Sequence, residues 1–140
     1  MVSVKNTYIY SEIIKEFNYP FGDIFIFDGF IISEINRGVV FNWDNHGKII
    51  TEDISCFLGT NGNDLVYISN RINSYSLVAS DWLKFFKHSY FLKSYLVVST
   101  DKIKTLNSMI ESLFFKDRIK RFNSLYAAIN FVRKGVLEVA

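Results

Sequence analysis

The sequence contains a single cysteine and only two histidines, and these scarcities exclude several classes of site. One cysteine cannot form an internal disulfide or a cysteine-rich zinc site. His46 and His88 lie far apart in the sequence, and neither belongs to an H-E-x-x-H motif. We therefore expect two surface histidines and no metal site.

Glycine-rich phosphate loops are missing as well. The seven glycines are scattered, and no expected strand leads into G-x-G-x-x-G or a G-K-[ST] loop. The absence of a G-x-S-x-G elbow excludes a standard α/β-hydrolase. No pair of carboxylates stands out as an acid–base dyad. We expect no cofactor, no catalytic residues and no enzymatic activity.

Long apolar runs and strong charge of one sign are absent too. No segment approaches the roughly 20 apolar residues of a membrane-spanning helix, so we expect no membrane insertion. Residues 1–6 show no pattern of a secretory signal, which favours a cytoplasmic location. The net charge of +2 is too small to indicate nucleic-acid binding.

The charge is nevertheless unevenly distributed. Residues 1–70 hold four Lys/Arg and nine Asp/Glu, a net charge of −5, whereas residues 71–140 hold twelve and five, a net charge of +7. This asymmetry fits either an anionic partner for the second half or two solvated faces of one domain.

Bulky apolar residues, by contrast, are abundant. Hydrophobic residues make up 49% of the 140 and aromatic residues 17%, enough for one domain with a large core. We expect a single domain over residues 1–140, with its core at about 13–134. Cys56 lies next to Phe57 and Leu58, so we expect it to be buried.

The first third of the chain predicts antiparallel strands. Residues 1–12 give no clear pattern, and residues 13–17 fit either a strand or a short helical turn before Pro20. Residues 23–28 and 30–35 are rich in β-branched and aromatic side chains, with Gly29 between them. This pattern predicts a hairpin.

From about residue 44 the spacing of the apolar residues becomes helical. We expect a helix that starts at Asp44 or Asn45 and ends at Gly59, then a buried strand at 64–69. A polar loop spans 70–79. Ser80 and Asp81 then begin the next helix, which leads to a buried strand at 95–99.

Two further helices flank a short basic strand. Asp101 is expected to cap the first, with an apolar face of Ile103, Leu106, Met109, Ile110, Leu113 and Phe114. Residues 118–122 suit an exposed sheet edge, and the last helix runs from Ser124 to Gly135. The order predicts an α/β domain with a mixed β-sheet, an antiparallel hairpin followed by parallel βαβ units, packed by about four helices.

The segment after the strand at 64–69 is the most informative for function. It would leave the carboxyl end of a parallel strand and lead to a helix N-terminus, where open α/β sheets bind ligands and anions. Arg71 adds a bidentate donor. The same Asn and Ser residues also serve as ordinary turn residues. The candidate binding or regulatory residues are Asn70, Arg71, Asn73, Ser74, Tyr75, Ser76 and Ser80.

A second, weaker candidate consists of apolar side chains. Phe41 and Trp43 lie between the hairpin and the first helix, and Trp82 opens the next helix. They fit a pocket, a dimer face or plain core.

The element order and several motifs resemble the SpoIIAA-like group, whose fold is similar to STAS domains and to CRAL-TRIO lipid-binding domains. The resemblance covers residues 13–134 and rests on Pro20-Phe21-Gly22, Glu34-Ile35-Asn36, the segments 38–43 and 67–76, and Asp81-Trp82. It implies a bacterial regulatory protein in which a serine before the second helix is phosphorylated. Ser74, Ser76 and Ser80 are the matching candidates, although the loop is longer and lacks the Asp-x-Ser-Gly form.

Three functional hypotheses follow. The first is a non-enzymatic regulatory or interaction module that contacts a protein partner, or a second copy in a homodimer, through the 70–80 loop and the following helix. The second is a carrier of a small apolar or lipid-like ligand. The third, which we favour least, is an enzyme that uses Arg71 with Asp28 or Glu34.

Overall fold

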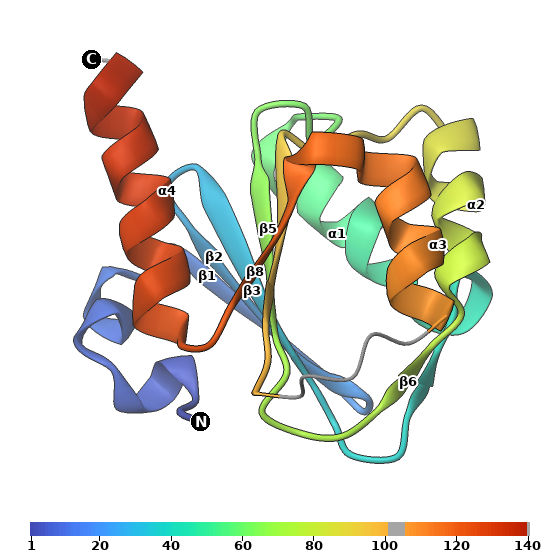
Figure 1. The fold of residues 1–140 in the computed structure, drawn as a ribbon, viewed down its shortest axis with the longest axis horizontal. Coiled ribbons are helices and arrows are strands. Elements are labelled where there is room, and N and C mark those ends of the chain that lie inside the picture. Colours follow the sequence, from blue (N-terminus) through green and yellow to red (C-terminus); the bar gives the residue numbers. More distant parts are fainter. Residues whose placement is uncertain (101–105, 140) are drawn as a thin grey trace.

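The structure, a computed structural model, describes residues 1–100 and 106–139. In this part of the chain, one six-stranded sheet has the order β1-β2-β3-β5-β7-β8, with helices on both faces (Figure 1). Its strands are β1 (Lys15–Tyr19), β2 (Gly22–Phe27), β3 (Phe30–Ile35), β5 (Val66–Asn70), β7 (Ser94–Val98) and β8 (Ile119–Phe122). The α/β class with a mixed sheet is as the sequence predicts.

The direction of the strands changes once across the sheet. β1, β2 and β3 form an antiparallel meander, so the segment before Pro20 is a strand and not a helical turn. β3–β5, β5–β7 and β7–β8 are parallel pairs. The register places Ser33 opposite Ser69. The polar residues at the ends of neighbouring strands are thereby brought together.

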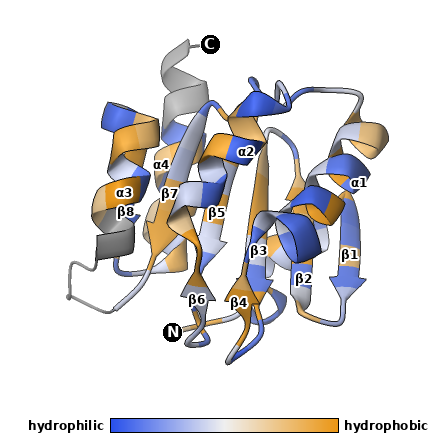
Figure 2. Ribbon diagram, turned by 90° about the vertical axis from the view of Figure 1, so that its right-hand side faces the viewer, coloured by the Kyte–Doolittle hydropathy of each residue, from blue (hydrophilic) through white to orange (hydrophobic). Residues whose placement is uncertain are grey.

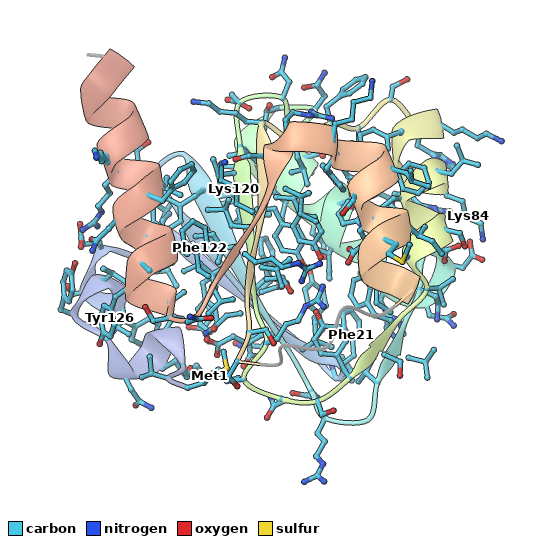
Figure 3. The ribbon with its side chains drawn as sticks, viewed as in Figure 1. Met1, Phe21, Lys84, Lys120, Phe122 and Tyr126 are labelled. Carbon is cyan, nitrogen blue, oxygen red and sulfur yellow. The ribbon has the colours of Figure 1, made fainter. Side chains whose placement is uncertain are left out.

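Helices cover the two faces unequally. α1 (Lys48–Leu58), α2 (Trp82–Lys87) and α3 (Leu106–Phe115) lie on one face, and α4 (Leu125–Val139) lies on the other (Figure 1). The central strands are buried on both sides, which explains their nearly continuous apolar sequences. Side chains fill the layer between the sheet and α1–α3 (Figure 3).

The N-terminal segment shares the face of α4. It forms two short 3-10 helices, Val4–Asn6 and Tyr8–Glu12, whose Val4 and Ile9 are buried in the core. Tyr8 stacks on Tyr126 of α4. Figure 3 shows Tyr126 beside the N-terminal segment. Residues 1–12 therefore belong to the packed fold, although their sequence shows no clear pattern.

Several helix boundaries differ from those expected. The first helix starts with a π-helical turn, Trp43–Gly47, and its cap is Asn42, whose Oδ1 accepts the N–H of Asn45. Ser124 caps α4 as predicted, by accepting the N–H of Ala127. α4 continues past Gly135 to Val139, because a glycine weakens a helix interior without necessarily ending it. The expected cap Asp101 and the expected apolar residue Ile103 lie outside the described residues.

Two predictions of burial are wrong. Cys56 is exposed, on the side of α1 that faces away from the sheet core. In α3, Met109 and Leu113 are 63% and 76% exposed, while Glu111 and Phe115 are buried. When apolar residues cover more than half of a helix, the sequence pattern does not define which side of the helix faces inward. In α3, the inward side is the one that contacts Trp82. Its indole Nε1 donates to Glu111 and its ring packs on Phe115.

Among the described residues, the helices are too short or too polar to cross a membrane.

β8 forms one edge of the sheet, with Lys120 and Arg121 exposed, as the sequence predicts.

Candidate functional site

An apolar cavity of about 110 Å³ lies between the sheet and the helices α1 and α2. The sheet contributes side chains of β2, β3, β5 and β7 to its walls. Aromatic rings dominate the lining, among them Phe41, Trp43, Tyr67, Trp82, Phe85 and Tyr95. An apolar cavity of about 150 Å³ in another protein binds benzene, so this cavity is on the scale of a single ring.

A short pair of strands forms part of the wall of this cavity. β4 (Val40–Phe41) and β6 (Ser76–Leu77) run parallel, outside the main sheet (Figure 2). The N–H of Ser76 donates to the carbonyl of Val39, and that of Val78 to Phe41. The predicted polar loop at 70–79 is therefore partly a strand. The prediction missed it because a strand of two residues is too short to show a period.

The β4–β6 pair has two different sides. Phe41, Tyr75 and Leu77 line the cavity, whereas Ser74 and Ser76 are exposed. This alternation follows from the two-residue period of extended chain. A single segment thus forms a wall of the cavity and a surface open to partners.

The position of Trp43 is fixed by a contact with the start of α2. The carboxylate of Asp81 accepts the backbone N–H of Trp43 at 2.8 Å. Asp81 therefore serves as a link between two segments and makes no cap of α2. α2 has only six residues, and Ser80 and Asp81 lie in a preceding 3-10 turn, Ala79–Asp81. The helix after the 70–80 loop therefore begins with this 3-10 turn, at the place where the sequence predicts its start.

His46 lies beside this wall. Its ring centroid is 4.6 Å from that of Phe21 and 5.3 Å from that of Phe41. Nδ1 accepts the N–H of Asn42 at 3.1 Å, which requires a neutral imidazole. Burial lowers the pKa of His46, in agreement with this role. His88 is exposed at the end of α2, as expected.

Three tyrosines separate the cavity from a polar cluster. Each contributes to the cavity wall, but each hydroxyl is bonded elsewhere. Tyr67 pairs with Ser33 at 2.7 Å, and Tyr75 with Ser69 at 3.0 Å. The hydroxyl of Tyr95 accepts from Arg71 at 2.8 Å. Burial raises the pKa values of Tyr67 and Tyr95, so both remain protonated.

Arg71 is the centre of this polar cluster. Its Nε donates to Ser69 and its Nη2 lies 3.5 Å from Oε1 of Glu111. Burial alone would lower the pKa of Arg71, but the neighbouring Tyr95, Tyr75 and Glu111 raise it, so the guanidinium stays charged. Sequence reasoning missed Glu111. The one available signal was a carboxylate within an otherwise apolar stretch of helix.

The predicted acidic partners of Arg71 lie elsewhere. Glu34 points to the α4 side of the sheet, where it accepts the N–H groups of Val4 and of the Asn70 side chain. Asp28 is exposed in the turn between β2 and β3, and this turn lies at the end of β3 opposite to Glu34. Neither residue contacts Arg71, so no catalytic group forms from these residues.

The remaining loop residues have separate roles. Asn70 is buried and bonds Glu34 and the carbonyl of Val2, and Asn73 donates to the carbonyl of Ile35. Both therefore hold the loop in place. Ser74, Ser76 and Ser80 are exposed. The structure thus divides the predicted set into residues that fix the loop and serines that face outward.

Among the described residues, no group of three or more His, Cys, Asp or Glu side chains is placed to hold a metal ion. No family model, curated protein or solved structure matches this chain. The resemblance to SpoIIAA-like domains therefore stays a prediction.

Proposed function

We propose that the protein is a non-enzymatic binding module that holds one small apolar molecule in the cavity behind the β4–β6 pair. The observation that carries this proposal is the cavity itself, which is lined by aromatic rings whose polar atoms are largely bonded to other protein groups. Such a site favours apolar ligands, because a ligand gains contact area there and loses few hydrogen bonds to water.

The size of the cavity limits the affinity. A single ring that buries about 200 Å² of apolar surface gains about 5 kcal/mol. This corresponds to a Kd on the order of 0.1–1 mM, before the cost of association is subtracted. A natural ligand that binds more tightly would need at least one directed polar contact.

Tryptophan fluorescence can report ligand binding to this chain. It contains two tryptophans, and both line the cavity. We expect a titration with benzene to change tryptophan emission in a saturable manner. Ile54→Phe fills the cavity and should weaken benzene binding at least tenfold, whereas Ile14→Phe, at an exposed position, should not.

A second variant provides a test that does not depend on the folding of Ile54→Phe. Ile54→Ala enlarges the cavity and should allow naphthalene to bind. Benzene binding that is equal in the wild type and in a folded Ile54→Phe variant would refute the proposal. So would a wild-type protein that does not bind benzene.

One observation supports a second candidate function, contact with a protein partner through the 70–80 loop. Ser74, Ser76 and Ser80 all face outward from a segment whose other side lines the cavity. The SpoIIAA-like resemblance suggests that such serines are phosphorylated. Native and denaturing intact mass of protein from its own host would detect a retained phosphate or a second protein. Unchanged partner binding after joint replacement of the three serines with alanine would contradict this candidate.

A further inference from the structure

The charge of the cavity wall restricts the ligand. Asp81 is the single charged residue among the described residues that line the cavity. Its carboxylate is already engaged, because it accepts the N–H of Trp43 and lies 3.5 Å from Lys84. Arg71 and Glu111 contribute no side chain to the lining and balance each other behind the aromatic rings. A charged ligand would lose its hydration without gaining a partner.

The shape of the wall favours a flat ligand. Tyr67 and Tyr95 present parallel rings, 4° apart in plane with centroids separated by 5.2 Å. Trp82 meets Phe85 edge to face at 88°. A wall built of such rings suits an aromatic ligand, because aromatic rings pack on one another by face or by edge.

Some polar groups of the wall have no partner. In the described part of the chain, the indole Nε1–H of Trp43 and the hydroxyls of Thr51 and Ser55 make no hydrogen bond to protein, although all three residues line the cavity. Trp43 is only 5% exposed as a whole, but its indole N–H retains accessible surface, so a ligand in the cavity could reach it.

The hydroxyls of α1 are suitably placed for one small polar group. Thr51 and Ser55 are four residues apart and thus lie on the same side of the helix, one turn from each other. Rotation about χ1 is sufficient to reorient either oxygen. By contrast, Asn42 and Thr60, which also line the cavity, already bond other protein groups.

From these observations we infer that the cavity is selective for an uncharged single aromatic ring that carries one hydroxyl group, a phenol-type ligand. This inference rests on the proposed function. The ring would occupy the aromatic part of the cavity. Its oxygen would accept from Trp43, and its O–H would donate to Thr51 or Ser55.

A comparison of three probes of similar size tests the inference: phenol, toluene and benzoate. Toluene is the more apolar of the two neutral molecules, so it binds more tightly in a site that makes no hydrogen bond. We expect phenol to bind three- to tenfold more tightly than toluene, as one or two hydrogen bonds would give. We expect no measurable binding of benzoate. Calorimetry measures all three affinities without depending on the tryptophans.

Conservative variants locate the polar contact. Trp43→Phe, Thr51→Val and Ser55→Ala each keep most of the side-chain volume, and at least one should reduce the phenol-to-toluene preference by threefold or more. Ser11→Ala and Thr100→Val, at exposed positions, are matched controls and should leave it unchanged.

The outcomes separate the two proposals. Equal or tighter binding of toluene, or a preference that none of the three variants changes, would overturn the phenol inference while the apolar site stands. Tight benzoate binding would overturn the argument from charge. If neither neutral probe binds, the proposed function itself fails.

Discussion

The guanidinium of Arg71 lies 3.5 Å from the carboxylate of Glu111, forty residues later in the chain. Glu111 is 1% exposed, and its Oε1 makes no hydrogen bond, while Oε2 accepts from the indole of Trp82. This ion pair joins the end of β5 to α3. It also supports the tyrosine and tryptophan rings that form the cavity wall.

A double-mutant cycle should show strong coupling within this pair. Glu111→Leu alone leaves a largely buried guanidinium without its carboxylate, and Arg71→Met alone leaves a buried carboxylate without its cation. Each should lower the free energy of unfolding by about 3 kcal/mol. The double variant should be more stable than either single one, as urea unfolding would show. Additive losses would mean that the two charges do not interact.

His46 should make stability dependent on pH. Because its pKa in the folded state lies below the ordinary value of 6.5, the unfolded chain takes up the proton first. The free energy of unfolding should therefore fall as the pH decreases through about 6.5, and this loss should level off below the folded-state pKa. Urea unfolding between pH 8 and pH 5 measures it.

Two variants assign this pH dependence. His46→Phe should be less stable at every pH, since Asn42 loses an acceptor, but it should lack the fall near pH 6.5. His88→Gln should retain it. An unchanged pH profile in the His46 variant would show that another group is responsible.

Gly62 and Gly59 should differ in their tolerance of alanine, although both have positive φ, +97° and +67°. A Cβ at Gly62 would lie 2.1 Å from the carbonyl oxygen of Phe91, whereas one at Gly59 meets nothing within 4 Å. Gly59→Ala should cost about 1 kcal/mol, the cost of a left-handed alanine. Gly62→Ala should cost about 3 kcal/mol, because overpacking is added. Equal melting temperatures for the two variants would contradict this close approach.

Cys56 should react with a thiol reagent in the native state. It is exposed on α1, so we expect one thiol per chain to be modified at a rate close to that in urea. A native rate at least a hundredfold slower would restore the burial that the sequence suggested. Cys56→Ser provides the blank and should fold normally.

Local patterns were sufficient to predict most of the fold. The β-branched and aromatic residues around Gly29 predict the β2–β3 hairpin, and Ser124 predicts the start of α4. These features depend on neighbours within a few residues. Predictions from local patterns fail where the pattern is too short, as in β6, or where it covers too much of a helix, as around Met109.

Sequence patterns predicted only part of the candidate site. Phe41, Trp43 and Trp82 were recognised as possible pocket residues, and they do line one cavity. The sequence did not indicate that Arg71 would pair with Glu111 and not with Asp28 or Glu34. Alternate residues of a strand point to opposite faces of the sheet, which sends Glu34 away from Arg71.

The sequence by itself thus determined the class of the fold, the order of its elements and the absence of the motifs of common enzymes. Periodicity and capping are local properties that a single chain displays directly. The tertiary structure alone decided that Glu111 is buried, that Cys56 is exposed and that aromatic side chains from distant segments leave a space between them. A cavity is what packing leaves unfilled, and it depends on the relative placement of segments up to about seventy residues apart.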